Sequence, residues 1–146
     1  MVCLGNICRS PLAEGILKSK LPDNGEFYVD SAGTSNYHIG ELPDTRSIEI
    51  ARKYGIDITS QRGRQFQLDD FDRFDLIYAM DTSNYHNILR IARNAEDEAK
   101  VKLILGELID YETVNVPDPY YGGDSGFEHV FQLLNKACNR IVGNYK

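Results

Sequence analysis

The stretch MVCLGNICRSP, residues 1–11, has the character of a strand end, a short loop and a helix start. Met1 to Cys3 are typical of the end of a buried strand. Pro11 favours the first turn of a helix, where its missing N–H breaks no hydrogen bond. Only two residues precede Cys3, so we expect the first strand to be truncated or very short.

The remainder of the chain alternates short apolar runs with segments of helical periodicity. The apolar runs predict strands at residues 26–31, 75–80 and 101–105. The periodic segments predict helices at residues 11–20, 47–54, 84–93 and 126–145. Asp44 is a suitable N-cap for the second of these helices and Gly55 a suitable stop. Thr82 or Ser83 can cap the third.

Strands that alternate with helices predict an α/β fold: a mostly parallel sheet with helices on both faces, in one domain spanning residues 1–146. Apolar faces of the first and last helices supply core residues: Leu12, Ala13, Ile16, Leu17, Phe127, Val130, Phe131, Leu134, Cys138 and Ile141. Such sheets bind ligands in the loops at the carboxyl ends of their strands. The loop after Cys3 is one of these.

The composition is that of an ordinary globular protein. Apolar residues make up 42% of the 146 residues and charged residues 26%. The net charge of −6 argues against nucleic-acid binding over the whole surface. No apolar run approaches the roughly 18 residues of a membrane helix, and no secretory signal is visible. Three cysteines are too few for a disulfide scaffold, so we expect a cytoplasmic protein without membrane or nucleic-acid partners.

The loop that follows Cys3 has the features of an oxyanion site. Backbone N–H groups between a strand end and a helix start point inward, and the helix dipole adds positive potential. Gly5 permits backbone angles that other residues resist, and Asn6 tolerates them better than most. Arg9 adds a planar fork of donors that fits two phosphate oxygens at once.

Cys3 lies inside this ring of donors. Positive surroundings lower the pKa of a thiol from about 8.5 to roughly 3.5–7.5, which leaves a nucleophilic thiolate at neutral pH. Ser10 is placed to donate a hydrogen bond to the sulfur. A nucleophile in a phosphate cradle predicts phosphoryl transfer through a cysteinyl-phosphate intermediate.

A second segment, VPDPYYGG at residues 116–123, supplies a candidate acid. A leaving tyrosyl or alkyl oxygen needs a proton, and Asp118 stands between two prolines that stiffen the chain. Tyr120 and Tyr121 follow it and offer aromatic walls. Taken alone, the segment is more typical of an ordinary turn, but beside the Cys3 loop the interpretation as an acid is favoured.

The motifs VCLGNICRSP at 2–11 and DPYY at 118–121 resemble those of the low-molecular-weight protein tyrosine phosphatases in order and spacing. The likeness covers nearly the whole chain. It implies a four-stranded parallel sheet flanked by helices, a Rossmann-like fold of the phosphotyrosine phosphatase I type. It also implies hydrolysis of phosphotyrosine and aryl phosphates, with Cys3 as nucleophile, Arg9 as phosphate clamp and Asp118 as general acid and then base.

The resemblance also implies supporting roles. Asn6 holds the shape of the loop, Ser10 supports the thiolate, and Cys8 is a redox partner for Cys3, although Cys8 also suits packing beneath the loop. Gln61 stands where many family members have histidine, which we expect to alter a supporting hydrogen bond. The substrate- and phosphate-binding set is Leu4, Gly5, Asn6, Ile7, Cys8, Ser10, Tyr37, Tyr120 and Tyr121.

The resemblance implies no metal and no organic cofactor. The expected partners are proteins that carry phosphotyrosine, with inorganic phosphate as product, and a monomer is the expected state. His38, His86 and His129 lack the spacing of metal ligands. The acidic run DDFD at residues 69–72 is interpreted as a solvated face or a helix start.

Three alternatives would keep the same loop. An arsenate reductase needs a relay of further cysteines, and Cys138, on the apolar face of the last helix, offers no obvious relay. A phosphoarginine phosphatase prefers threonine where this chain has Ile7. A non-catalytic phosphotyrosine-binding module would have no need to retain nucleophile, clamp and acid together.

Overall fold

The computed structural model describes residues 1–108, 113–121 and 124–145. Within them, four parallel strands form one sheet in the order β2-β1-β3-β4. The strands are β1 (Val2–Cys3), β2 (Ala32–Gly33), β3 (Ile77–Ala79) and β4 (Val101–Leu103). The central strand β1 pairs through Val2 with both Ala32 and Ala79. The predicted parallel sheet of four strands is confirmed.

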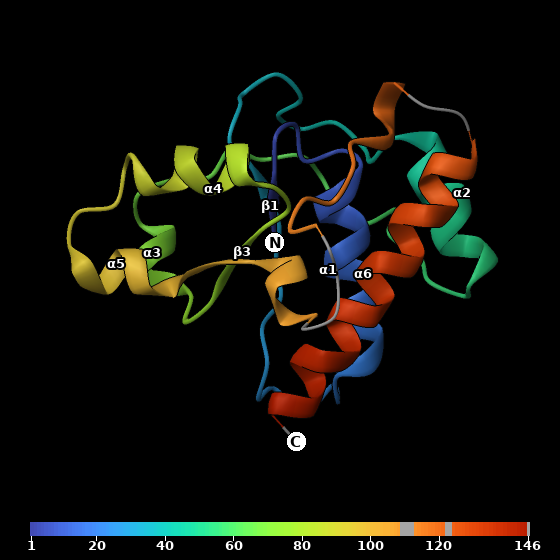
Figure 1. Ribbon diagram of the computed structural model, residues 1–146. Coiled ribbons are helices and arrows are strands. Elements are labelled where there is room, and N and C mark those ends of the chain that lie inside the picture. The colour runs from blue at the N-terminus through green and yellow to red at the C-terminus, as the bar shows by residue number, and fades with distance from the viewer. Residues whose placement is uncertain (109–112, 122–123, 146) are drawn as a thin grey trace.

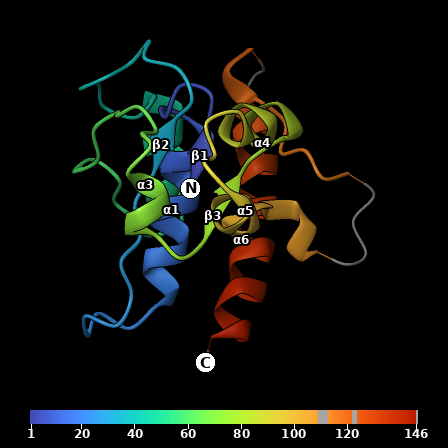
Figure 2. The same ribbon diagram turned by 90° about the vertical axis from the view of Figure 1, so that its left-hand side faces the viewer.

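Helices cover both faces of the sheet, as predicted. In Figure 1, α1 (Arg9–Lys20), α2 (Thr45–Lys53) and α6 (Asp124–Asn144) lie on one side. The other side carries α3 (Asp70–Arg73), α4 (Thr82–Leu89) and α5 (Ala95–Lys100), which Figure 2 brings to the front. Short 3-10 turns follow at η1 (Ile104–Glu107) and η2 (Pro119–Tyr121). No helix among the described residues is long and apolar enough to cross a membrane.

Two apolar cores flank the sheet because successive strand residues point to opposite faces. Cys3 and Tyr78 face the larger core, which α1 and α6 fill. Val2, Ile77 and Ala79 face the smaller one. The predicted apolar faces of α1 and α6 are all buried: Leu12, Ala13, Ile16, Leu17, Phe127, Val130, Phe131, Leu134, Cys138 and Ile141.

The predicted strand at residues 26–31 is wrong. The strand in this region is Ala32–Gly33, which pairs with Val2–Cys3. The preceding residues have no strand geometry, although the carbonyl of Asp30 accepts a hydrogen bond from the Met1 amine at 3.0 Å. A strand exists only where a neighbouring strand offers partners, and β1 offers two residues.

Two helix starts show how local signals compete. Asp44 caps α2 as predicted, accepting from the backbone N–H of Arg46 at 2.9 Å, and Gly55 follows the helix with a φ of +79°. The N-cap of α4 is Asp81, which accepts from the N–H of Asn84 at 2.8 Å, rather than Thr82 or Ser83. A carboxylate one residue earlier satisfies the free N–H groups of the first turn as well as a hydroxyl would.

The acidic run at 69–72 does contain a helix start, since α3 begins at Asp70. The solvated-face interpretation is wrong for Asp70, whose side chain is 1% exposed and lies 3.0 Å from the guanidinium of Arg64. A buried carboxylate needs a cation and hydrogen bonds to offset its lost hydration. The short helix α5 went unpredicted because its sequence, AEDEAK, carries almost no apolar periodicity.

Candidate active site

The loop after β1 lies at the carboxyl end of the sheet, at the same upper end of Figure 1 as the turn η2. Asn6 takes a left-handed conformation with a φ of 57°, as the sequence suggested for this position. Gly33 lets the loop approach β2 closely, because a Cβ there would lie 2.8 Å from the Leu4 carbonyl oxygen. The loop is therefore shaped by its own asparagine and by a glycine on the neighbouring strand.

Cys3 sits at the base of this loop and is 2% exposed. Its Sγ lies 3.0 Å from the hydroxyl oxygen of Ser10. The backbone N–H of Asn6 donates to the same sulfur at 3.3 Å. The sulfur therefore lies within hydrogen-bond distance of one hydroxyl and one backbone N–H.

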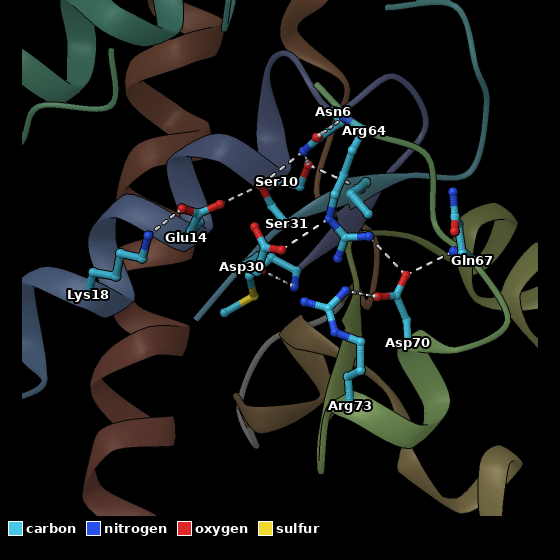
Figure 3. A network of polar contacts seen from close by, with 12 residues as sticks. Asn6, Ser10, Glu14, Lys18, Asp30, Ser31, Arg64, Gln67, Asp70 and Arg73 are labelled. Atoms are coloured by element: carbon cyan, nitrogen blue, oxygen red, sulfur yellow. Dashed lines mark hydrogen bonds and ion pairs between the residues drawn. The ribbon is translucent and has the colours of Figure 1, made fainter. Parts of the chain in front are cut away.

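A buried network fixes the Asn6 side chain (Figure 3). Its amide nitrogen donates to the hydroxyls of Ser10 and Ser31 at 2.7 and 3.0 Å. Its amide oxygen accepts from the backbone N–H of Arg64 at 3.0 Å. Ser31 in turn donates to the carboxylate of Glu14 at 2.6 Å. Since Asn6 uses the Ser10 oxygen as an acceptor, the Ser10 hydroxyl proton is directed elsewhere, with the Cys3 sulfur at 3.0 Å and the Ala32 carbonyl at 3.5 Å as its two acceptors.

Sequence reasoning found Asn6 and Ser10 but missed Ser31, Glu14 and Arg64. Ser31 immediately precedes β2, which brings it to the central strand. Glu14 is 3% exposed on α1, in a segment where only the apolar face was assigned. Its other oxygen accepts from Lys18 at 2.6 Å. A charged residue on a buried helix face is the signal that could have found it.

Arg9 begins α1 and is 3% exposed. Its Nη1 donates to Asp81 at 2.6 Å and to the carbonyl of Val116 at 3.1 Å. Burial disfavours its charge, but the nearby Cys3 and the Asp81 carboxylate outweigh burial and raise the pKa of Arg9 above its ordinary value. Asp81 was missed as a partner, although it follows β3 at the carboxyl end of the sheet.

Asp118 lies beside Arg9, with its Oδ2 at 3.8 Å from the Nη2 of Arg9 and its side chain 36% exposed. Its Oδ1 accepts from the backbone N–H of Tyr120 at 3.0 Å. The structure therefore brings together, at one end of the sheet, residues 3, 9 and 118 that the sequence had singled out. The carboxylate remains open to solvent, where a proton can be exchanged.

The predicted pocket walls differ in how far the structure describes them. Leu4 and Tyr120 are partly exposed, and Ile7 is half-buried. Tyr37 is 72% exposed, in a segment that runs along the loop: Ser35 donates to the Leu4 carbonyl, and a Cβ at Gly5 would lie 3.0 Å from the His38 ring. The side chain of Tyr121 lies outside the described residues.

The remaining cysteines are buried and free. Burial, reinforced by the charges of Asp44 and Cys3, raises the pKa of Cys8 to about 12, so Cys8 is a neutral thiol at pH 7. Cys138 is fully buried in the core, and burial likewise raises its pKa to about 12. The core role predicted for Cys138 is confirmed. Gln61 donates to the carbonyl of Pro11, in α1, at 3.0 Å.

Chemically, the site joins a thiol held by two donors, a buried guanidinium and an exposed carboxylate within reach of that guanidinium. Such a group can bind a tetrahedral oxyanion, attack its central atom and exchange a proton with a departing oxygen. Within the described residues, no group of three or more His, Cys, Asp or Glu side chains could hold a metal ion.

Comparison with known proteins places the chain in a family. The sequence model of the family described as "Low molecular weight phosphotyrosine protein phosphatase" matches residues 1–145. The human low molecular weight phosphotyrosine protein phosphatase is 40% identical over an alignment of 145 residues that covers 97% of this chain and 90% of the human protein.

Two solved structures have the same fold. The crystal structure of YfkJ from Bacillus subtilis matches with a TM-score of 0.89 at 38% identity, covering 98% of this chain and 90% of that one. The crystal structure of a Drosophila arginine phosphatase matches with a TM-score of 0.91 at 33% identity, covering 99% of this chain and 95% of that one.

Proposed function

Because the chain belongs to the low molecular weight phosphotyrosine protein phosphatase family and is an enzyme, we propose that Cys3, Arg9 and Asp118 carry its reaction. The observation that carries this proposal is their convergence: a thiol held by Ser10, a buried guanidinium, and a carboxylate 3.8 Å from that guanidinium. The substrates are phosphotyrosine residues of proteins and aryl phosphates, and the product is inorganic phosphate.

In the first step the Cys3 thiolate attacks phosphorus and the bond to the tyrosyl oxygen breaks. Arg9 and the loop N–H groups hold the three non-bridging phosphate oxygens. Asp118, protonated, gives its proton to the leaving oxygen, which departs as a neutral phenol. The first step ends in a cysteinyl-phosphate and an Asp118 carboxylate.

In the second step a water molecule attacks the cysteinyl-phosphate. Asp118 accepts a proton from that water, the phosphorus–sulfur bond breaks and inorganic phosphate forms. The departing thiolate regains the hydrogen bonds from Ser10 and the Asn6 N–H. The acid of one step becomes the base of the next, which requires an accessible carboxylate, and Asp118 is one.

Aryl phosphates suit the walls of the pocket better than phosphoarginine does. Leu4 and Ile7 in the loop, together with the exposed Tyr120 two residues after Asp118, offer apolar and aromatic surface for a phenyl ring. Phosphoarginine is the second candidate substrate, favoured by the 33% identity to a Drosophila arginine phosphatase. Arsenate reduction receives no such support, because Cys138 is buried in the core and cannot serve as a relay.

Replacing Asp118 by asparagine tests the proposal. We expect the rate of the first step to fall about 10²–10⁴-fold for a phenyl phosphate with a poor leaving group, because general acid catalysis is worth that much. The loss should shrink steadily as the leaving phenol becomes more acidic. Single-turnover rates across a series of substituted phenyl phosphates measure this, and an equal loss along the series would remove Asp118 from the role of acid.

Cys8 is proposed to protect the nucleophile from irreversible oxidation. Peroxide converts a thiolate to a sulfenic acid, and a second thiol can capture that sulfenic acid as a disulfide with release of water. Because burial keeps Cys8 as a thiol, it does not compete as the group that is first oxidised.

Three free cysteines, one of which must stay reduced to act, also fit a cytoplasmic enzyme.

We therefore expect peroxide to inactivate the wild type reversibly and the Cys8→Ala variant irreversibly. Activity is measured after peroxide and then after treatment with a dithiol. Cys138→Ala serves as the matched control and should recover like the wild type. Equal recovery of the wild type and Cys8→Ala would make Cys8 a packing residue only.

A further inference from the structure

The segment that carries Asp118 is held against α2 by a stacked guanidinium. The central carbon of the Arg46 guanidinium lies 5.5 Å from the centre of the Tyr120 ring and 4.7 Å from that of Phe127. Phe127 is 1% exposed in the first turns of α6, so it is a fixed support. Tyr120 in turn donates its backbone N–H to Asp118.

The same guanidinium is bound to a carboxylate beside the loop of Cys3. Arg46 donates from Nε and Nη2 to the two oxygens of Asp44 at 3.0 and 3.1 Å, a two-pronged pair. Burial opposes the charge of Asp44, but the hydrogen bonds from Arg46 outweigh burial and hold the pKa of Asp44 below its usual range. The pair is therefore charged at neutral pH, and its fork geometry fixes the plane of the guanidinium.

Asp44 is itself attached to the phosphate-binding loop. Its backbone N–H donates to the carbonyl of Ile7 at 2.8 Å. Three residues on, the Ser47 hydroxyl donates to the carbonyl of Cys8 at 3.3 Å. The start of α2 is thus bound to the loop at two points, and Arg46 projects from this start to Tyr120.

We propose that Arg46 is a positioning residue that fixes the Asp118 segment relative to the Cys3 loop, acting through Tyr120. The inference rests on the proposed role of Asp118 as general acid. The Asp118 carboxylate is partly exposed and lies 3.8 Å from the Arg9 guanidinium. The chain before it is bonded at Val116, whose N–H donates to the Met80 carbonyl and whose carbonyl accepts from Arg9, but Asp118 lies two residues beyond these bonds. A proton donor on a surface segment needs such an anchor, because a misplacement of about 1 Å can cost about 10²-fold in rate.

Two substitutions separate the features of Arg46. Arg46→Met keeps an unbranched side chain against Phe127 but removes the charge and the fork. Arg46→Lys keeps the charge over the ring but loses the two-pronged bond to Asp44. We expect Arg46→Met to slow the first step about 10- to 100-fold for a phenyl phosphate with a poor leaving group. For a substrate whose leaving phenol is highly acidic, the loss in rate should be less than about 3-fold. The first-step rate of Arg46→Lys should lie between that of Arg46→Met and that of the wild type.

The measurement is the single-turnover rate at saturating substrate across the leaving-group series, together with inhibition by inorganic phosphate. Phosphate affinity should not change, since Arg9 and the loop donors remain. Arg90→Met, which removes an exposed guanidinium that donates to Asn87, is the matched control and should behave as the wild type. A merely structural role would lower the rate equally for all substrates.

A double substitution decides whether Arg46 acts through Asp118. In an Asp118→Asn background, Arg46→Met should cost less than about 3-fold, because coupled residues are not additive. The inference would be overturned if the losses of the two substitutions were additive in the double variant. It would also be overturned if the loss in Arg46→Met did not depend on the leaving group. Both outcomes would leave Asp118 as the acid. A flat leaving-group series for Asp118→Asn alone would instead overturn the proposed function.

Discussion

Cys3→Ser is expected to abolish turnover while leaving oxyanion binding intact. A serine hydroxyl is not ionised at neutral pH, so the substitution removes the nucleophile without removing the cradle. The Asn6 N–H, the Arg9 guanidinium and the remaining loop N–H groups still face the anion. Loss of a catalytic nucleophile that acts as part of a unit lowers kcat by about 10⁴-fold or more.

The test is hydrolysis of an aryl phosphate alongside calorimetric binding of inorganic phosphate. The variant should bind phosphate within about 3-fold of the wild type, because the oxyanion donors are unchanged. Cys138→Ala, in the core of α6, is the control for loss of a buried thiol and should keep its activity. Turnover in Cys3→Ser near the wild-type rate would remove Cys3 from the mechanism.

Arg9→Lys is expected to lower kcat about 10³-fold or more, because an arginine that stabilises phosphoryl transfer is worth about 10³–10⁵-fold. Lysine keeps the charge but is a point donor that cannot span two phosphate oxygens. Arg9 also donates to Asp81 and to the carbonyl of Val116. A lysine ammonium cannot satisfy both partners and the phosphate together, so the anion site is poorly assembled.

Initial rates with an aryl phosphate measure this loss, and thermal unfolding shows whether the fold survives. Arg90→Lys, at an exposed arginine, should be unaffected in both measurements. A folded Arg9→Lys variant with a kcat within about 10-fold of the wild type would mean that charge alone suffices, against the fork geometry on which the proposal depends.

The leaving group series distinguishes these residues from Asp118 and Arg46. Losses in Cys3→Ser and Arg9→Lys should be large for every substrate, since all substrates present the same phosphate. Losses in Asp118→Asn and Arg46→Met should depend on the phenol, since the proton matters only to a poor leaving group. The two patterns divide the site into a part that handles phosphate and a part that handles the departing oxygen.

Features that depend on neighbours along the chain were predictable from the sequence. The loop at 4–8 is continuous with the strand before it and the helix after it. A single motif therefore predicted the anion site, the nucleophile and the clamp. The left-handed Asn6 and the Asp44 cap of α2 are also local, because their partners lie within a few residues. The apolar faces of α1 and α6 followed from helical periodicity for the same reason.

Only the tertiary structure decided which distant residues meet. The sequence placed the strand at residues 26–31 rather than at Ala32–Gly33, because the extent of this strand depends on its pairing with β1. Arg9 binds Asp81, which is 72 positions away, and Asn6 meets Arg64, which is 58 away. No periodicity records such contacts.

The sequence by itself therefore determined the phosphate-binding motif, because the loop and the residues proposed as nucleophile and clamp, Cys3 and Arg9, occupy one short run whose geometry the local backbone sets. The tertiary structure decided how that chemistry is held in place. Glu14, Ser31 and Arg64 fix the loop from beneath, and Arg46 ties the acid segment to it, through contacts that exist only after the chain has folded. Burial gives the contacts of Asn6, Glu14 and Ser31 their strength, because a polar group removed from water must find its partner within the protein.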